Sequence, residues 1–290
     1  FVYAQLFDDD NLAIIQDILP RKSLLKRKAA GKKIDYQLIA ANIDIAIIMQ
    51  ALDSNFNIRR LERYLVIIND NNITPLILLS KSDLISPEEA EEKKKQIFEI
   101  LPDAKIFSFS NNNLSDIENI KSLFTPHKTY CLLGSSGVGK TTLLNNLIHQ
   151  DLYKTQPIRE KDDRGKHTTT RRELIVLEND AIIIDNPGMR ELGIISNESG
   201  ISSTFGEIDE LSDQCKYKDC THTVEAGCAV LEALERGEIS RERYENFLKL
   251  YKESKYNEMS YVEKRQKDKK WGKFFNSTMK EIKNRKDSYK

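Results

Sequence analysis

The sequence predicts an α/β fold in which a mostly parallel β-sheet is covered by helices on both faces. From Asn42 onward, short runs of consecutive apolar residues alternate with segments of helical spacing, as buried parallel strands alternate with their connecting helices. One such run, 129–133, passes through a glycine-rich loop into a helix that starts near Lys140. Segments of different composition flank this region, so we predict three structural parts, at 1–35, 36–195 and 196–290.

The N-terminal part is predicted to begin with two short strands, 1–7 and 11–19, joined by an acidic turn. Because two strands alone do not make a stable domain, we interpret them as the end of a small β-barrel whose beginning lies upstream of Phe1. A basic run at 21–33 follows. It suits a solvated linker and a contact with a nucleic-acid phosphate backbone equally well.

The central part is predicted to hold the sheet and its helices. The two strands at its end are separated by a three-residue turn, so we expect an antiparallel hairpin at the edge of the sheet. The expected strands are 43–49, 75–79, 105–109, 129–133, 173–177 and 181–185, and the expected helices are 58–68, 87–101, 114–124 and one from about 140.

The glycine-rich loop matches the pattern G-x-x-x-x-G-K-[ST] between a strand and a helix. Its glycines let several backbone N–H groups point at one anion, and the helix N-terminus adds partial positive charge. Lys140 is expected to reach the β- and γ-phosphates during catalysis, and the Thr141 hydroxyl to ligate Mg²⁺. The alternative is a chance turn before a helix. The predicted nucleotide-binding residues are Gly134, Ser135, Ser136, Gly137, Val138, Gly139, Lys140, Thr141 and Thr142.

Two further segments indicate which base is bound. Ser80, Lys81, Ser82 and Asp83 follow a predicted strand, and loops at the carboxyl ends of parallel strands face the ligand crevice. The carboxylate of Asp83 can accept from both N1–H and the exocyclic amine of guanine, whereas adenine offers no such pair. Lys81 could lay its stem across the base. Backbone amides at Ser110 and Asn111, after the next strand, could meet the guanine carbonyl oxygen.

Two loops around the predicted γ-phosphate position complete the site. Asp185 is placed to hold Mg²⁺ through water and the Gly188 amide to meet the γ-phosphate. Thr169 is our candidate among neighbouring threonines for the Mg²⁺ shell. Met189 stands where small GTPases carry a glutamine that orients water, so His167 is the candidate for that role. The alternative for His167 is a solvated loop histidine.

A cluster of soft ligands follows the sheet region. Cys215, Cys220, His222 and Cys228 supply three thiols and one imidazole, a closed tetrahedral set that suits one structural Zn²⁺ per chain. The alternative is a disulfide with two bystanders. Cys131 lies within a predicted strand and is expected to be a core residue. Short helices are predicted at 231–234 and 241–251.

Overall composition says little about partners, because 45 Lys and Arg residues balance 45 Asp and Glu residues. Only local clusters are informative, such as the basic tail from Lys255, which is interleaved with aromatic residues. No stretch approaches the ~20 apolar residues of a membrane span, and no signal peptide is visible. We therefore expect a cytoplasmic protein with no membrane partner.

The order of the motifs resembles that of one family. The segments at 80–83 and 110–111 precede the phosphate loop, whereas the equivalent motifs follow it in Ras-like GTPases. With G-K-H-T-T-T at 165–170, D-N-P-G-M-R-E-L-G at 185–193 and the Cys/His cluster, the chain resembles the circularly permuted GTPases of the ribosome small-subunit-dependent type, known as RsgA or YjeQ. The resemblance extends from about Arg21 to Tyr251.

The resemblance implies a circularly permuted P-loop GTPase domain, an OB-type barrel before it and a small zinc-binding helical domain after it. It implies hydrolysis of GTP to GDP and phosphate, coupled to late maturation of the small ribosomal subunit and stimulated by that subunit and its rRNA. It also implies the catalytic role of His167, and we expect a monomer. Ser80 departs from the family, which has Asn or, in relatives, Thr at that position, so nucleotide affinity is expected to differ.

Two other functions fit parts of the sequence. An rRNA-binding assembly factor with a weak or vestigial nucleotide site would explain Ser80, Met189 and the basic ends. An ATP-using P-loop enzyme needs only the phosphate loop, and Asp83 argues against it because adenine lacks the matching donors. The first of these predicts no nucleotide binding, and the second predicts a preference for ATP.

Overall fold

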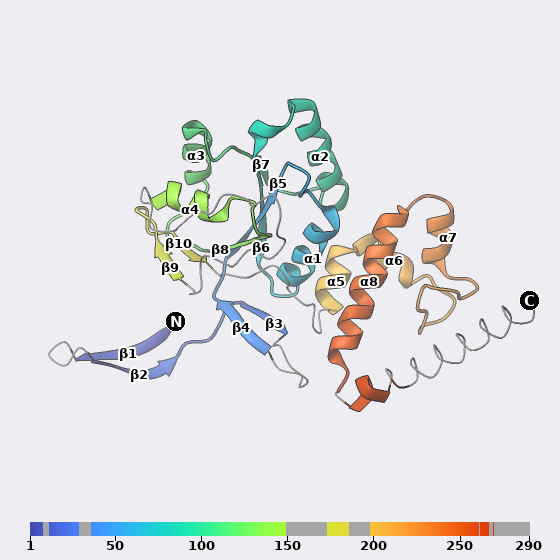
Figure 1. The fold of residues 1–290 in the computed structure, drawn as a ribbon. Helices are drawn as coiled ribbons and strands as arrows, with labels where there is room; N and C mark the ends of the chain where they lie inside the picture. The colour runs from blue at the N-terminus through green and yellow to red at the C-terminus, as the bar shows by residue number, and fades with distance from the viewer. Residues whose placement is uncertain are drawn as a thin grey trace, which may run out of the picture.

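A single six-stranded sheet forms the centre of the protein, in the order β7-β6-β5-β8-β10-β9 (Figure 1). The computed structural model describes residues 1–7, 12–28, 36–148, 173–185, 198–260, 262–266 and 269. The neighbours from β7 to β10 run parallel, and β9 pairs antiparallel with β10 at the edge, which confirms the predicted hairpin. The strands are β5 (Ile45–Ala51), β6 (Thr74–Ser80), β7 (Ile106–Ser108), β8 (Thr129–Gly134), β9 (Glu173–Val176) and β10 (Ile182–Asp185).

Helices cover both faces of the sheet, as predicted, because successive side chains of its buried strands point to opposite faces. Ile48 of β5 joins the core beneath α1 (Ile58–Asn69) and α2 (Pro87–Ile100). Its neighbour Ile47 joins the core beneath α3 (Leu114–Lys121) and α4 (Lys140–Ile148). Each fully buried Ile or Leu contributes about 1.5–3 kcal/mol. Cys131 is buried in β8, which confirms its core assignment.

Side-chain caps set where the covering helices begin. Asn57 accepts a hydrogen bond from the Arg60 backbone N–H at 3.0 Å and so starts α1. Ser86 does the same for Glu89 at 3.2 Å, with proline in the first turn of α2. Such caps satisfy N–H groups that have no partner within the helix. Helix α1 therefore begins directly after the loop that leaves β5.

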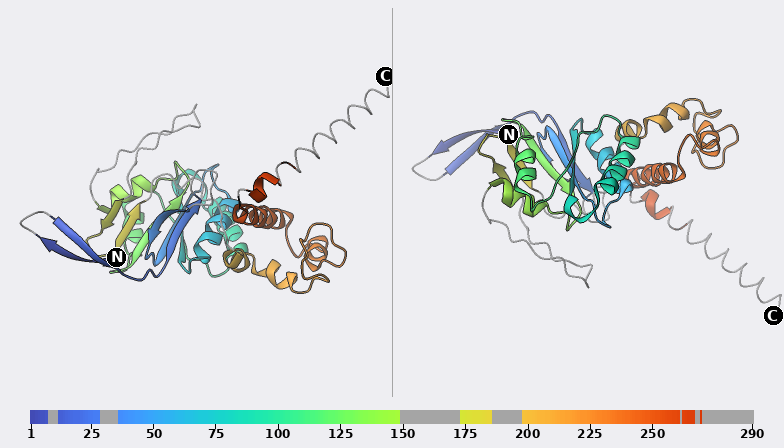
Figure 2. Two further views of the ribbon diagram at one scale, coloured as in Figure 1. Left: turned by 90° about the horizontal axis from the view of Figure 1, so that it is seen from below. Right: turned by 90° about the horizontal axis from the view of Figure 1, so that it is seen from above.

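In the described residues before Asn42, four strands pair as two antiparallel hairpins. The first pairs β1 (Val2–Phe7) with β2 (Leu12–Ile18), as predicted, and extends away from the central sheet (Figure 2). The second pairs β3 (Leu24–Lys28) with β4 (Tyr36–Ala41) and was not predicted, because β3 lies in the basic run interpreted as a linker or phosphate-binding segment. Strand β3 is ordered by pairing with β4, and its fully buried Leu25 packs into the core.

The described part of the C-terminal region contains α5 (Glu198–Thr204), α6 (Gly206–Ser212), α7 (Ala229–Glu235) and α8 (Arg241–Glu258). The first two were not predicted because their sequences are largely polar. Ile201, Phe205 and Ile208 nevertheless join the core that includes α1. At Gly200 an added Cβ would collide with the carbonyl oxygen of Val66, so α5 approaches α1 closely there. Helix α8 also continues seven residues past the predicted end at Tyr251.

These helices lie at the end of the molecule opposite the β1–β2 hairpin (Figure 2). No helix among the described residues has the length and apolar character needed to cross a membrane.

Candidate nucleotide-binding site and metal centre

The glycine-rich loop connects β8 to α4 in a conformation that depends on glycine. Gly137 and Gly139 have φ of +78° and +91°, in the region that side chains rarely adopt. At Gly134 an added Cβ would lie 2.6 Å from the Met49 carbonyl oxygen, and at Gly139 it would lie 2.5 Å from Nδ2 of Asn111. The loop therefore curls tightly against neighbouring strands and loops, as a phosphate cradle requires.

Lys140, the first residue of α4, folds back over this loop. Its Nζ donates to the carbonyl oxygens of Gly134 and Ser135, both at 2.8 Å. An ammonium held at this place can exchange carbonyl acceptors for phosphate oxygens with little movement. Thr141 and Thr142 follow in the first turn of the helix and are half-buried.

The loop lies at a topological switch point of the sheet. The chain runs outward from β5 through β6 to β7, and then returns to place β8 on the other side of β5. In open α/β sheets, ligands bind outside the carboxyl ends of the strands at such a point. The loops after β5, β6, β7 and β8 all leave from this end of the parallel strands.

Ser80 connects the predicted guanine-binding segment to the phosphate loop. It is completely buried at the end of β6, and its Oγ donates to the Val138 carbonyl oxygen at 2.7 Å. A second contact joins this Oγ to the Gln50 carbonyl oxygen at 3.3 Å. The short serine side chain therefore spans the two segments directly, although it has fewer donors than asparagine.

Lys81 adopts a left-handed conformation, with φ of +61°, and its Nζ forms an ion pair with Asp53 at 2.7 Å. Burial by itself would raise the pKa of Asp53. The hydrogen bonds from Lys81 and Asn55, with the charges of Lys81 and Lys93, outweigh that effect and lower it. This pair fixes the start of the 3₁₀ turn Ser82–Leu84, on which Asp83 is exposed. The Ser82 N–H donates to the Phe109 carbonyl oxygen at 3.2 Å.

The segment after β7 contacts the phosphate loop through Asn111. Its Nδ2 donates to the Gly139 carbonyl oxygen at 3.4 Å, and its backbone carbonyl oxygen accepts from Nδ2 of Asn146 in α4 at 3.0 Å. The Ser110 N–H donates to Asp116 Oδ2 at 2.7 Å. The sequence predicts this amide as a donor to the guanine carbonyl oxygen, but in the structure its hydrogen bond is made within the protein.

The remaining residues discussed for the γ-phosphate side of the site are Asp185, His167, Thr169, Gly188 and Met189. Asp185 is buried at the end of β10, the strand next to β8. His167, Thr169, Gly188 and Met189 lie outside the described residues.

Two residues that sequence reasoning missed contact the phosphate loop from α1 and the loop before it. Arg60 Nη1 donates to Ser135 Oγ at 2.5 Å and to Asn55 Oδ1 at 3.0 Å. Asn55 Nδ2 also donates to Ser135 Oγ, at 3.3 Å. The position of these residues just after β5 could have indicated the contact, but only with the knowledge that β5 and β8 are neighbours in the sheet.

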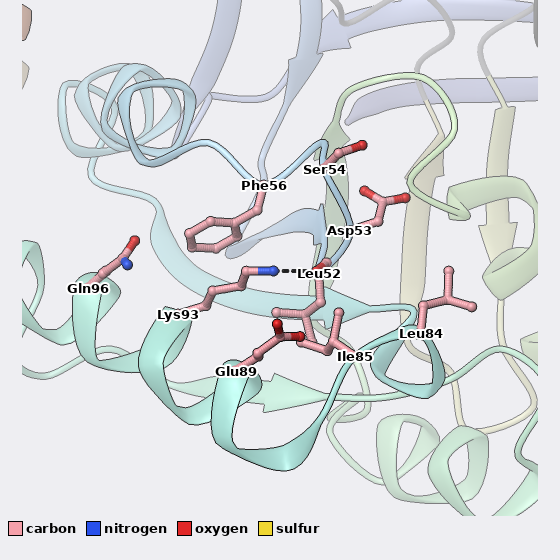
Figure 3. Close-up of a pocket in the computed structure, with 9 residues that line it drawn as sticks. All are labelled: Leu52, Asp53, Ser54, Phe56, Leu84, Ile85, Glu89, Lys93 and Gln96. Carbon is pink, nitrogen blue, oxygen red and sulfur yellow. Dashed lines mark hydrogen bonds between the residues drawn. The ribbon is translucent and has the colours of Figure 1, made fainter.

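A separate open cleft of about 710 Å³ lies between the β5–α1 loop and α2 (Figure 3). Lys93 crosses it, donates to the Leu52 carbonyl oxygen at 2.6 Å and lies 5.7 Å from the centre of the Phe56 ring. Asp53 and Leu84 border this cleft, but the phosphate loop and Asp83 do not line it. The cleft is thus a neighbour of the predicted nucleotide site and distinct from it.

The four predicted metal ligands come together in the C-terminal region. The ligand atoms of Cys215, Cys220, His222 and Cys228 all lie within 4.8 Å of one another, so the group could hold a metal ion. His222 Nδ1 lies 3.6 Å from the Cys215 sulfur and 3.5 Å from the Cys228 sulfur. Desolvation, with the neighbouring thiols of Cys228 and Cys215, raises the pKa of Cys220 to about 12, so a cation would be needed to stabilise its thiolate.

Ser212 determines which nitrogen of His222 faces the thiols as an acceptor. The Ser212 hydroxyl donates to the Ile208 carbonyl oxygen at 2.7 Å, so its oxygen is left to accept from His222 Nε2 at 3.2 Å. The proton is therefore on Nε2, and Nδ1 presents its lone pair toward the sulfur atoms. Tyr244 of α8 donates to the His222 carbonyl oxygen at 2.6 Å and connects the cluster to that helix.

Comparison with known proteins gives consistent matches. The sequence model of the RsgA GTPase family matches residues 18–195. A protein of Vibrio parahaemolyticus named small ribosomal subunit biogenesis GTPase RsgA 2 is 38% identical over 272 residues, which are 94% of this chain and 75% of the relative. A protein of the same name from Listeria monocytogenes is 43% identical over 245 residues, 84% of this chain and 70% of the relative.

Two solved structures share the fold. The crystal structure of YjeQ from Thermotoga maritima matches with a TM-score of 0.60 and 26% identity, covering 85% of this chain and 80% of that one. YloQ, described as a circularly permuted GTPase, matches with a TM-score of 0.60 and 25% identity, covering 92% and 79%.

Proposed function

Because this chain belongs to the RsgA GTPase family, we propose that it hydrolyses GTP to GDP and phosphate in the maturation of the small ribosomal subunit. One observation carries the nucleotide part of the proposal, namely the buried hydrogen bond from Ser80 to the Val138 carbonyl oxygen. This bond holds the predicted guanine-binding segment, 80–83, against the phosphate loop. A vestigial site would have no need of this completely buried link.

In the proposed reaction, water attacks the γ-phosphorus and the bond to the β–γ bridging oxygen breaks, so that GDP leaves with that electron pair. The phosphate-loop amides and Lys140 bind the oxygens on which negative charge gathers. Bound Mg²⁺ would neutralise part of that charge, and Thr141, Thr169 and Asp185 are the residues we propose for its shell. His167 is proposed to position the attacking water.

On the base side, Asp83 is proposed to accept from guanine N1–H and its amine, and Lys81 to cover one face of the ring. The Lys81–Asp53 ion pair supports this role because it fixes the backbone on which Asp83 stands. For the γ-phosphate we propose the Gly188 amide. The alternative of an ATP-using enzyme is disfavoured because adenine would leave the Asp83 carboxylate unpaired.

We propose that the Cys/His cluster holds one structural Zn²⁺, because three thiols and an imidazole with a fixed tautomer form a closed tetrahedral set. We further propose the three predicted parts, 1–35, 36–195 and 196–290, with the first boundary moved to the end of β4 at Ala41 because β3 pairs with β4 across residue 35. We also propose a monomer that acts in the cytoplasm. The proposed partners are GTP, GDP, the small subunit and its rRNA.

The test is turnover of GTP by the full chain, measured with and without purified small ribosomal subunits, alongside titration with labelled GTP, GDP and ATP. We expect tight binding of both guanine nucleotides, weak binding of ATP, and a hydrolysis rate that rises when subunits are added. Absence of guanine-nucleotide binding would contradict the proposal, and a preference for ATP would identify a different enzyme.

A further inference from the structure

Ser135 of the phosphate loop is held from two sides. Its carbonyl oxygen accepts from Lys140 of the same loop at 2.8 Å. Its hydroxyl oxygen accepts from Arg60 of α1 at 2.5 Å and from Asn55 at 3.3 Å. Lys140 belongs to the sequence motif, whereas Arg60 and Asn55 come from a segment about 75 residues earlier in the chain.

Arg60 differs from the other arginines of α1 in what it contacts. Arg59 forms an ion pair with Glu245 of α8 at 3.3 Å, and Arg63 forms two contacts of 2.6 Å with Glu253. The partners of Arg60 are the neutral oxygens of Ser135 and Asn55. In the part of the chain that the structure describes, no carboxylate lies within ion-pair distance of Arg60.

The half-buried guanidinium of Arg60 is bonded to neutral acceptors, so among the described residues no neighbouring carboxylate offsets its attraction for an anion at the phosphate loop. Arg60 and Lys140 both donate to Ser135, the first to its hydroxyl oxygen and the second to its carbonyl oxygen. Charge-assisted hydrogen bonds are about twice as strong as neutral ones, so this contact orders the first turn of the loop more firmly than a water molecule would.

The position of Arg60 is itself fixed by the packing of α1. On the side of the helix that faces the C-terminal region, Glu62 bonds to Arg243 and Arg63 to Glu253. The cap at Asn57 fixes the helix start. Arg60 therefore reaches the phosphate loop from a rigid element, which lowers the entropy that its contact costs.

From this geometry we propose that Arg60 is a positioning residue of the nucleotide site. It fixes the start of the phosphate loop through Ser135, and its positive charge favours the nucleotide with more phosphates. The inference rests on the proposed function, since it assumes that the loop binds GTP. It adds a residue outside the sequence motif to the groups that determine GTP affinity.

The experiment measures GTP, GDP and ATP affinity, hydrolysis and nucleotide-free thermal melting for Arg60→Ala, Arg60→Lys and the matched control Arg59→Ala. We expect Arg60→Ala to weaken GTP binding ~10-fold and GDP binding less, with the preference for GTP over ATP unchanged. Arg60→Lys should recover part of the loss, because lysine keeps the charge and one donor but not the planar fork. Arg59→Ala should bind both nucleotides normally.

A second comparison tests the route through Ser135. Ser135→Ala should reproduce most of the loss seen in Arg60→Ala, and the double variant should lose little more than either alone. Unchanged GTP affinity in Arg60→Ala would overturn the inference, as would additive losses in the double variant. It would also be overturned if the loss of folding free energy without nucleotide, derived from thermal melting, equalled the loss of GTP-binding free energy. If the unaltered chain binds no GTP, the proposed function fails instead.

Discussion

Arg243 of α8 forms an ion pair with Glu62 of α1 at 2.5 Å, between residues separated by 181 positions in the sequence. Glu62 is only 1% exposed and also accepts from Asn246. Arg243 donates to the Thr204 carbonyl oxygen at 2.7 Å and lies 4.5 Å from the centre of the Phe205 ring. The pair joins the helix beside the phosphate loop to the C-terminal helices.

Removing one partner of this pair is predicted to destabilise the protein strongly. Arg243→Ala leaves the Glu62 carboxylate buried without its counter-ion, at a cost of about 3–5 kcal/mol. The free energy of unfolding in urea measures the effect. Arg241→Ala, which alters a largely exposed arginine paired with Glu245 at 3.6 Å, is the matched control and should change stability little. Equal losses in the two variants would contradict the special role of the buried pair.

The same site predicts a dependence of stability on pH. Desolvation raises the pKa of Glu62, and the Arg243 charge only partly offsets it. Since the folded pKa lies above the ordinary value of 4.5, the contribution to stability is fully present below that value and is lost as pH rises through the raised pKa. Glu62→Gln should flatten this part of the pH profile of unfolding. A profile unchanged by the substitution would assign the dependence to other groups.

The link between the base-reading segment and the phosphate loop is tested at Ser80. Ser80→Ala removes the donor to Val138 and leaves that carbonyl oxygen buried, so we expect a loss of about 1–3 kcal/mol in stability and weaker GTP binding. Calorimetric GTP titration and thermal melting measure the two effects. Ser122→Ala is the control, because the Ser122 hydroxyl is exposed and donates to the Asn119 carbonyl oxygen at 2.7 Å, outside the predicted nucleotide site.

Base discrimination is predicted to depend on Asp83. In Asp83→Asn the amide cannot accept from two guanine donors at once, so GTP binding should lose ~2–4 kcal/mol while ATP binding changes little. Competitive titration with the two nucleotides measures the difference. Full retention of GTP affinity would move the guanine site away from the segment that ends β6.

Metal content is predicted to depend on the ligands and on the tautomer of His222. Elemental analysis of protein purified without chelator should find one zinc ion per chain. Ser212→Ala should lower metal affinity ~10–100-fold without removing a ligand, because the hydroxyl that holds Nε2–H is lost. Ser202→Ala, whose hydroxyl bonds to Asp209 instead, is the control and should keep full zinc occupancy. A metal-free protein would refute the assignment.

Water positioning by His167 is tested through hydrolysis. His167→Ala should bind GTP normally but lose ~10²–10⁴-fold of the subunit-stimulated rate, the scale of a residue that activates a nucleophile. Binding to small subunits with a non-hydrolysable GTP analogue should persist. Full stimulation in this variant would show that another group positions the water.

Much of the site could be predicted from the sequence because its determinants are local. The phosphate loop is a contiguous stretch of glycines followed directly by the lysine and the helix. Gly137 and Gly139 adopt positive φ, which glycine allows whatever the tertiary contacts are. The Cys/His ligands likewise lie in one short segment. The alternation of apolar runs and amphipathic helices predicted the sheet, because a strand that is buried on both faces consists of consecutive apolar residues.

What the sequence alone determined about this protein is therefore its parallel sheet, its phosphate loop and its four soft ligands, each encoded within a few neighbouring residues. Only the tertiary structure decided that β3 pairs with β4, that α5 and α6 are helical, and that Arg60 contacts Ser135 and Arg243 contacts Glu62. The reason is physical. These features depend on partners far away in the chain, and a polar segment becomes ordered only when tertiary packing supplies the contacts that its own sequence lacks.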